Sequence, residues 1–299
     1  MRRKFHTLDV FTDAALAGNP LAVVLDCDGL DDSRMQAIAR EFNLSETVFV
    51  FAPRDPVNTA RLRIFTPGRE LPFAGHPTVG AAVLLAQLRA PELLARQDLR
   101  VVVEEGVGDI VCVARHRPNQ APAAYFTLPR LPEPAGEAPP AATLANRLGL
   151  APDEIGFDAH RPSVYSAGNP FLFAPVASRA ALAKARPNAH PWGAGGEPGV
   201  YLYTREAERP GSSFRARMFA PGLGVVEDPA TGSAAAAFAG VLMRFEKPAE
   251  GETTYVIEQG FEMGRPSLIA LGLEVENGAL RSATIGGSAV IISQGAINV

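Results

Sequence analysis

A carboxylate placed directly before an apolar strand is the first residue in this sequence that could do chemistry. In the segment FNLSETVFVF, Glu46 precedes five residues typical of a buried strand. A carboxyl group at the mouth of such a strand can lie in a half-desolvated pocket, which raises its pKa toward the range useful for proton transfer. A residue at a strand end can equally be solvated. The residues alone therefore make Glu46 a candidate general acid or base, with a plain surface acid as the alternative.

Two turns rich in Gly, Pro, Thr and Ser each precede an apolar helix. The turn GHPTVGAA contains Gly75 and His76, and the turn EDPATGSA contains Asp228, Gly232 and Ser233. The first turn of a helix leaves backbone N–H groups unpaired and carries partial positive charge, so it can bind a carboxylate or a phosphate. The structural alternatives are a tight turn at Gly-His-Pro, a helix cap at Asp228 and a space-filling Ser233.

Three motifs recur in the same order about 150 residues apart. Gly-Asn-Pro at 18, which contains Asn19, returns at 168; RIFTPG at 63 returns as RMFAPG at 217; GHPTVGAA at 75 resembles EDPATGSA at 227. A period this long predicts two similar domains rather than small stacked units. We expect the two glycine-rich turns to face each other across a cleft between the domains, where a small-molecule pocket commonly lies.

Periodicity predicts the elements that must position these residues. Strands are expected at 4–11, 21–25, 46–51, 60–65, 99–103, 109–114, 201–204, 214–218, 254–258, 268–274, 280–285 and 289–293. Helices are expected through residue 42, capped by Asp32 or Ser33, and at 77–88 and 231–245. The fold class is α+β, with each half a curved, mainly antiparallel sheet wrapped around its apolar helix.

The proline-rich segment 128–143 reads as the natural linker between the two halves. We expect a first repeat domain at 1–120 and a second at 121–299. Whether the C-terminal strand crosses back to the first domain stays open at this point.

Composition excludes several classes of function. The 299 residues are 47% apolar and 20% charged, with a net charge of −4, which favours neither nucleic acid nor an anionic membrane as partner. No apolar stretch approaches the roughly 18 residues that a membrane span needs. Together with Cys27 and Cys112, which lack CxxC spacing, this leads us to expect a cytoplasmic protein. The scattered histidines and the absence of nucleotide-binding loops predict no metal and no cofactor.

Five motifs together carry a resemblance to a known family. They are FHTLDVFTDAALAGNPLAVVL, NLSETVF, RIFTPGRELPFAGHPTVGAA, EDPATGSAAAAFAGVL and IEQGFEMGRPS. In this order, from about Phe5 to Ser267, they resemble the PhzF family of phenazine-biosynthesis-type proteins, which shares the diaminopimelate epimerase fold. The resemblance implies two pseudo-symmetric domains, each a sheet around a central helix, with the active site between them. It also implies a homodimer.

The resemblance implies roles for individual residues. Glu46 corresponds to the family's proposed general acid or base, His76 to the histidine of the Gly-His-Pro turn, and Asp228 to the aspartate of the Asp-Pro-x-Thr-Gly-Ser motif. Their neighbours Gly75, Gly232 and Ser233 correspond to substrate-binding positions. Asn19 and Arg265 also occupy motif positions; Asn19 is expected to bind substrate, and the role of Arg265 is left open.

Three functions follow as hypotheses. The first is a cofactor-independent isomerase in which Glu46 moves a proton within a small cyclic carboxylic acid, such as trans-2,3-dihydro-3-hydroxyanthranilate. The second is an epimerase or racemase of an amino-acid-like substrate, which needs a second base, for which Asp228 is the candidate. Related epimerases use one cysteine from each domain, but Cys27 and Cys112 fall outside the repeated motifs. The third is a non-catalytic protein that binds a small carboxylate.

Overall fold

The protein folds into two compact units. The computed structural model describes residues 2–188, 192 and 197–299. Unit 1 runs to Pro129 and resumes at Gly286, and unit 2 is Arg130–Ile285. The boundary expected after residue 120 therefore falls before a strand that belongs to unit 1, and the C-terminal segment belongs to unit 1 as well.

Unit 1 is a closed sheet. Its strands are β1 (Arg2–Val10), β2 (Asn19–Val24), β3 (Glu46–Phe51), β4 (Ala60–Phe65), β5 (Glu70–Leu71), β6 (Leu99–Glu105), β7 (Gly108–Arg115), β8 (Ala123–Thr127) and the last part of β17 (Ala279–Asn298). The pairs β1–β2, β3–β4, β6–β7 and β7–β8 are antiparallel, and β2–β3 and β4–β6 are parallel. Because β17 pairs with both β1 and β8, the sheet closes on itself and leaves no edge at that point.

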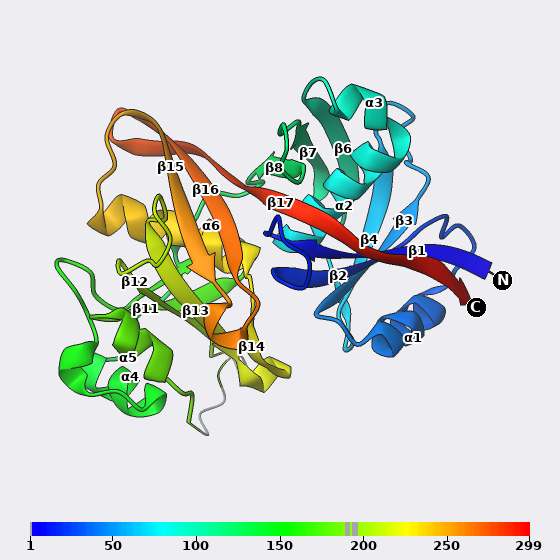
Figure 1. Ribbon diagram of the computed structural model, residues 1–299. Coiled ribbons are helices and arrows are strands. Elements are labelled where there is room, and N and C mark those ends of the chain that lie inside the picture. Colours follow the sequence, from blue (N-terminus) through cyan, green and yellow to red (C-terminus); the bar gives the residue numbers. More distant parts are fainter. Residues whose placement is uncertain (1, 189–191, 193–196) are drawn as a thin grey trace. The chain divides into compact units, whose positions relative to one another are not determined.

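Helix α2 (Gly75–Arg89) fills the interior of this sheet. Every residue from Gly75 to Ala86 is buried, and the helix contacts β1, β2, β3, β6, β7 and β8 (Figure 1). A helix that is apolar on all sides is stable only in such surroundings. Helices α1 (Asp32–Phe42) and α3 (Pro91–Leu94) lie outside the sheet. The cap of α1 is Asp31, which accepts the backbone N–H of Arg34, and not Asp32 or Ser33.

Unit 2 repeats the same order of strand directions. Its strands are β9 (Glu133–Pro134), β10 (Ser163–Ser166), β11 (Pro170–Pro175), β12 (Gly199–Thr204), β13 (Phe214–Ala220), β14 (Val225–Asp228), β15 (Gly251–Gln259), β16 (Ser267–Glu276) and the first part of β17. The pairs β10–β11, β12–β13 and β15–β16 are antiparallel, and β11–β12 and β13–β15 are parallel. Each described sheet is therefore mixed rather than purely antiparallel.

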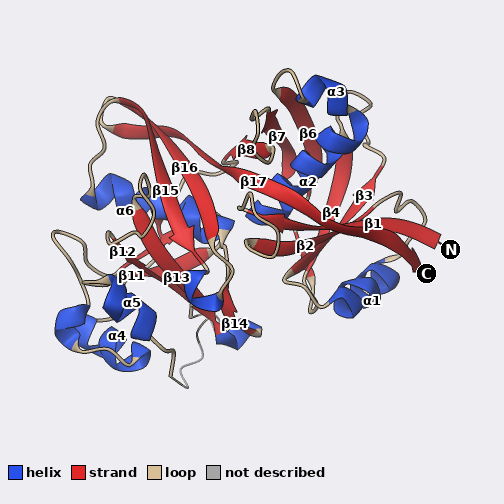
Figure 2. Ribbon diagram, in the orientation of Figure 1, coloured by secondary structure: helices blue, strands red, loops and turns tan. Residues whose placement is uncertain are grey.

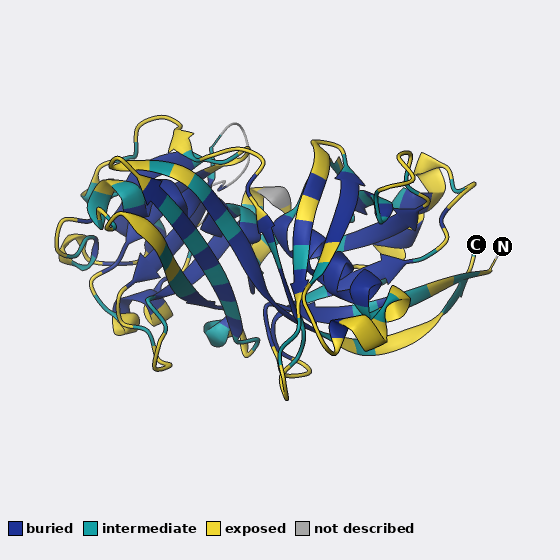
Figure 3. Ribbon diagram, turned by 90° about the horizontal axis from the view of Figure 1, so that it is seen from above, coloured by how far each residue is buried: buried dark blue, intermediate teal, exposed yellow. Residues whose placement is uncertain are grey.

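Helix α6 (Gly232–Phe245) is the long helix of unit 2. It contacts β9, β10, β11 and β16, and its residues from Ala234 to Leu242 are buried. Two shorter helices, α4 (Ala141–Leu148) and α5 (Arg179–Lys184), pack on the other side of β11 and β12 (Figure 2). In both units the long helix and the facing side of the strands are buried, while exposed residues gather in loops and outer faces (Figure 3).

Strand register supports the internal duplication and corrects one of its matches. Ile64 of β4 pairs with Leu71 just as Met218 of β13 pairs with Asp228. The helices then begin at Gly75 and at Gly232, 157 residues later. The match of Gly75 with Glu227 that the motifs suggested is therefore wrong, because the segment from Met218 to its partner Asp228 is three residues longer than the segment from Ile64 to its partner Leu71. In register, Glu227 corresponds to Glu70, which lies before the helix.

Two other expectations need adjustment. The strands expected at 280–285 and 289–293 are parts of one strand, β17, which continues from unit 2 into unit 1. The segment 128–143 is not a pure linker, because it contains β9 and the first turn of α4. Among the described residues, no helix is long and apolar enough to cross a membrane.

The duplicated ion pairs Arg63–Glu70 and Arg217–Glu227 provide a stability test. Arg217 is buried, binds both oxygens of Glu227 at 2.8 and 2.9 Å, and donates to the carbonyls of Leu182 and Ala185. Arg63 makes the same bidentate pair, but its side chain is 23% exposed.

We expect Arg217→Met to lower the free energy of unfolding by about 3–5 kcal/mol, because it removes a buried cation and leaves Glu227, whose side chain is only 15% exposed, without its partner. Arg63→Met should cost about 1 kcal/mol, since water can replace the lost contacts. Urea denaturation of both variants measures the difference. Equal losses would contradict burial as the cause.

Candidate functional site

Glu46 and His76 lie side by side in unit 1. Glu46 is the first residue of β3, and His76 is the second residue of α2. The distance from His76 Nε2 to Glu46 Oε2 is 3.3 Å, and the two side chains are 6% and 16% exposed. Two residues that are 30 positions apart in the sequence are thus brought together at the mouth of a buried helix.

The environment keeps His76 uncharged. Burial lowers the pKa of its imidazole to about 3, so the ring is neutral near pH 7. A neutral imidazole has one N–H donor and one acceptor nitrogen. It can therefore donate to an ionised Glu46 or accept from a protonated one. The arrangement suits a carboxyl group that takes up and gives back a proton.

The start of α2 leaves backbone donors available. Its N-cap, Ala74, has no side chain that can bind the first N–H groups, and no acidic residue lies in the first turn. Uncapped N–H groups and the helix dipole together favour an anion at this position. Gly75 and His76 are the residues that carry these donors.

The start of α6 in unit 2 has a polar network of its own. The hydroxyl of Thr231 donates to Asp228 Oδ2 at 2.6 Å. The amide of Gln259 donates to the Asp228 carbonyl at 2.8 Å and to Thr231 Oγ1 at 2.9 Å, and it accepts the backbone N–H of Thr231. Asp228 is therefore held in place by two neighbours, directly before Gly232 and Ser233.

Gln259 was not among the expected site residues. It is fully buried at the end of β15, in the segment YVIEQG. One feature of the sequence could have identified it: Gln259 follows Glu258 at the end of an apolar strand. If Glu258 points outward, alternation along the strand predicts that Gln259 points inward. Arg265 lies six residues further on, where its N–H donates to the carbonyl of Gly260 and closes a short loop.

The two Gly-Asn-Pro copies lie in different surroundings. Asn19 is fully buried at the first position of β2. Gly18 before it has φ +66°, and a Cβ there would lie 2.4 Å from the carbonyl oxygen of Val10, so only glycine fits. In the second copy, Gly168 is exposed and has open space around it. The second copy is a surface turn, and only the first builds a buried polar position.

Strand register also shows which chemical groups are duplicated. Glu46 pairs with Leu21, and the corresponding pair in unit 2 is Gly199 with Phe171. The helix starts likewise match His76 with Ser233, and Asp228 corresponds to Leu71. The side chains that could transfer a proton, those of Glu46, His76 and Asp228, therefore each occur in one unit and have no counterpart of the same type in the other. The position that matches Glu46 holds a glycine and no second base.

The cysteines are unsuited to acid–base chemistry. Both are fully buried, and both belong to unit 1. Burial raises the pKa of Cys27 to about 12 and that of Cys112 further, so neither forms a thiolate near neutral pH. The thiol of Cys27 donates to the carbonyl of Val24. A pair of thiols with one from each unit is not available in this chain.

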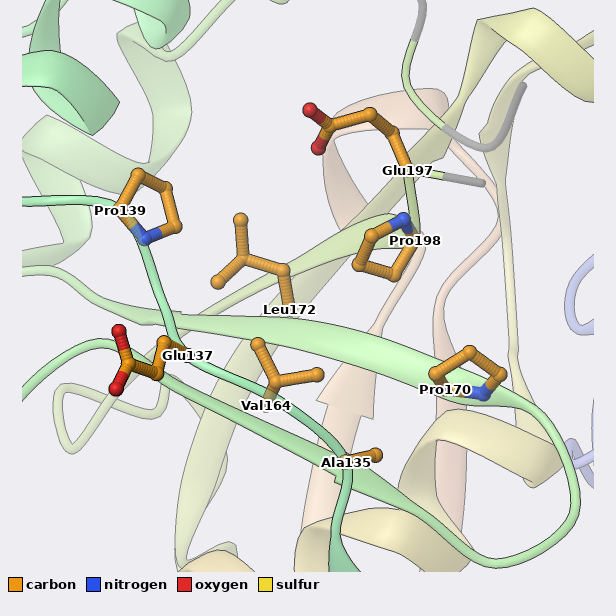
Figure 4. A pocket seen from close by; sticks show the side chains of 8 residues that line it. All are labelled: Ala135, Glu137, Pro139, Val164, Pro170, Leu172, Glu197 and Pro198. Carbon is orange, nitrogen blue, oxygen red and sulfur yellow. The ribbon is translucent and has the colours of Figure 1, made fainter. Parts of the chain in front are cut away.

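Other candidate sites contain none of the expected residues. No group of three or more His, Cys, Asp or Glu among the described residues is arranged to hold a metal ion. A cavity of about 230 Å³ lies in unit 2 (Figure 4). Its lining comprises Ala135, Glu137, Pro139, Val164, Pro170, Leu172, Glu197 and Pro198.

Comparison with known proteins adds a family to this geometry. A family model described as "Phenazine biosynthesis-like protein" (PhzC-PhzF) matches residues 8–295. An uncharacterized isomerase of Mesorhizobium japonicum is 50% identical over 98% of both chains. The trans-2,3-dihydro-3-hydroxyanthranilate isomerase of Pseudomonas aeruginosa is 33% identical over 98% of both chains. A solved PhzF-family structure from Bacillus anthracis covers the full length of both chains at 25% identity, with a TM-score of 0.88.

The neutral state of His76 can be checked directly. In protein labelled with ¹⁵N-histidine, the ring nitrogens of His76 should keep the shifts of a neutral imidazole from pH 8 down to about pH 4, because burial opposes protonation. The spectrum of His76→Asn identifies the signal. A titration of this ring above pH 5 would contradict the burial of His76 as the cause of its neutral state.

Proposed function

Because the chain belongs to the PhzC-PhzF family of phenazine biosynthesis-like proteins, we propose that it moves a proton within a small cyclic carboxylic acid. The family is one of isomerases, and this chain is an enzyme of that class. A substrate resembling trans-2,3-dihydro-3-hydroxyanthranilate is proposed from the named activity of the 33% identical relative. The form we propose is a homodimeric, cofactor-independent enzyme of the cytoplasm.

The observation that carries the proposal is the single carboxylate beside a neutral imidazole. As base, Glu46 takes a proton from one ring carbon. The C–H electron pair forms a new double bond to the neighbouring carbon, and the electron pair of the existing double bond shifts to the carbon that is protonated next. Glu46, now protonated, returns the same proton to another carbon on the same face, so that the product is an isomer and the enzyme is regenerated. His76, whose Nε2 lies 3.3 Å from Glu46 Oε2, is assigned to stabilising the ionised carboxylate before and after the transfer.

Substrate binding is proposed to use the starts of the two long helices. The N–H groups at Gly75 and His76 suit the substrate carboxylate, because no side chain caps them. Gly232 and Ser233 present the same kind of backbone at the start of α6. Asp228, held by Thr231, is assigned to the polar groups of the substrate and to proton sharing. Asn19 is assigned to binding because its polar side chain is fully buried.

Epimerisation is the second candidate, and it has weaker support. It requires a base on each face of the reacting carbon. The position matching Glu46 is Gly199, where a Cβ would already lie 3.3 Å from Met218, and the thiols are protonated. Asp228 is the remaining candidate for a second base.

Proton exchange in D₂O tests the proposal. We expect the protein to turn over trans-2,3-dihydro-3-hydroxyanthranilate, or another member of a panel of cyclic and amino carboxylic acids, with deuterium entering the newly protonated carbon to the extent that the proton held by Glu46 exchanges with solvent before it is returned. Glu46→Gln should lower the rate by about 10²–10⁴-fold, because the amide cannot accept the proton. Glu41→Gln, on the exposed face of α1, is the matched control and should act as wild type.

The position of the label separates the two candidates. Deuterium on the original carbon with inversion of configuration would favour an epimerase, with Asp228 as the second base. Full activity of Glu46→Gln would overturn the assignment of the base.

A further inference from the structure

A second glutamate approaches helix α2 from inside unit 1, and the proposed reaction does not use it. Glu105 is the last residue of β6, and its Oε1 lies 2.7 Å from Thr78 Oγ1 in the first turns of α2. Its other oxygen, Oε2, is buried and has no hydrogen-bond partner among the described residues. An ionised carboxylate in this position would leave one charged oxygen unsatisfied in an apolar interior.

A count of protons at Thr78 decides the state of Glu105. The threonine oxygen lies 2.8 Å from the carbonyl of Ala74 and 2.7 Å from Glu105 Oε1. A threonine hydroxyl has a single proton to donate, and a carbonyl can only accept. If Thr78 donates to Ala74, the short contact to Glu105 needs a proton on the glutamate. Both contacts are satisfied at once only when Glu105 is a carboxylic acid that donates to Thr78.

Unit 2 holds a permanent donor at the matching position. β4 pairs with β6 through Ala60 and Val103, and β13 pairs with β15 through Phe214 and Ile257. Val103 and Ile257 therefore occupy equivalent positions, and so do the residues two positions after them, Glu105 and Gln259. The amide of Gln259 donates to Thr231 Oγ1, which donates to Asp228. In both units the side chain at this register position contacts a threonine hydroxyl near the start of the long helix, although the threonines are not equivalent: Thr231 precedes Gly232, and Thr78 is the fourth residue of α2.

The preceding residue shows that the register match is chemical as well as geometric. Glu104 accepts the backbone N–H groups of Arg54 and Asp55, and its counterpart Glu258 accepts those of Glu208 and Arg209. The outward carboxylates are conserved between the two units in residue type and in role. At the next, inward position, one unit has an amide and the other an acid, which can donate a hydrogen bond as the amide does only while it is protonated.

We propose that Glu105 works as a neutral carboxylic acid, a positioning residue that donates to Thr78 and so holds the first turn of α2 with Gly75 and His76. Its side chain takes the part in unit 1 that Gln259 takes in unit 2. The consequence for catalysis rests on the function proposed above, in which that first turn binds the substrate carboxylate.

The surroundings agree with a neutral group. Burial raises the pKa of Glu105 to about 8. Among the described residues, the groups that face Glu105 supply no positive charge. From β7, Cys112 faces the same interior and remains a thiol, and α2 contributes the neutral His76. On β4, Arg61 lies opposite Glu104 in the strand register, so its side chain points to the outer face of the sheet, away from Glu105.

Loss of the proton has two effects at the same place. It removes the donor to Thr78, and it puts a negative charge beside the helix start that is meant to attract a substrate carboxylate. Activity should therefore fall as Glu105 ionises, above about pH 8. Folding should respond in the same direction. Between the usual pKa of 4.5 and about 8, the folded chain keeps a proton that the unfolded chain has lost, so stability decreases as the pH rises through this window.

Glu105→Gln is the decisive variant, because the amide donates at every pH. Relative to wild type, the variant should gain thermal stability as the pH rises from 5 to about 8, and the gain should level off above that pH, where Glu105 is ionised in both the folded and the unfolded wild type. Its activity should match wild type near pH 7, and the ratio of wild-type to variant activity should fall about tenfold between pH 7 and pH 9. Glu105→Leu, which fills the space without a donor, should be impaired at every pH.

Glu104→Gln is the matched control on the adjacent residue. The backbone N–H groups of Asp55 and Arg54 lower the pKa of Glu104, so its ionised form stabilises the fold above that pKa. The control should therefore be less stable than wild type at pH 7, with the difference shrinking as the pH falls through the carboxyl range.

The outcomes separate this proposal from the proposed function. A stability difference between wild type and Glu105→Gln that does not change from pH 5 to pH 9 would overturn the neutral acid, whatever the enzyme's substrate. A pH-dependent difference with no change in the activity ratio would overturn the link to the helix start. Full activity of Glu46→Gln would remove the base while leaving the stability result for Glu105 intact.

Discussion

The enclosure of helix α2 by its own sheet is the constraint on which unit 1 depends. Twelve consecutive residues of this helix are buried, so its polar ends are the places where backbone groups need partners. At the N-terminal end no side chain caps the first N–H groups, and glycine, an imidazole and a threonine stand where a capping carboxylate could have been. Glu46 at the start of β3 lies beside His76 at the start of α2, and Glu105 at the end of β6 contacts Thr78 of the same helix.

The duplication explains how two similar halves came to hold different chemistry. Structural contacts such as the bidentate pairs of Arg63 and Arg217 are kept in both units. Groups that could transfer protons are not. Glu46 matches a glycine, His76 matches Ser233, and Asp228 matches Leu71. A shared scaffold with unshared reactive groups fits an enzyme whose substrate is not symmetric.

Much of this was predictable from the sequence. The strands 46–51 and 60–65 have the expected bounds, and both long helices were found, because apolar periodicity records burial directly. Short elements such as β5, β9 and α3 were missed, since two to four residues carry no period. The elements β8, β10, β11, α4 and α5, of four to eight residues, were missed as well. Parallel pairs were missed as well, because period-two alternation does not record strand direction.

The proton-holding roles at the site were only partly visible. Glu46 and His76 stood out by their motifs, and their separation of 3.3 Å needed the fold. Glu105 and Gln259 were invisible as a pair, because their equivalence depends on which residues face each other across parallel strands. A glutamate in a sequence also looks ionised by default, and only its buried neighbours reveal the proton.

The long strand β17 links the completion of unit 1 to the last part of the chain. Residues 2–10 of β1 pair with residues between Ala289 and Asn298, and β8 pairs with the same strand, so neither pairing can form before that segment is synthesised. During synthesis, the N-terminal half leaves the ribosome long before these partners exist. Unit 2, almost whole by then, can fold first. The first half of the sequence would thus be the last to close, with its apolar helix in need of protection until the final residues arrive.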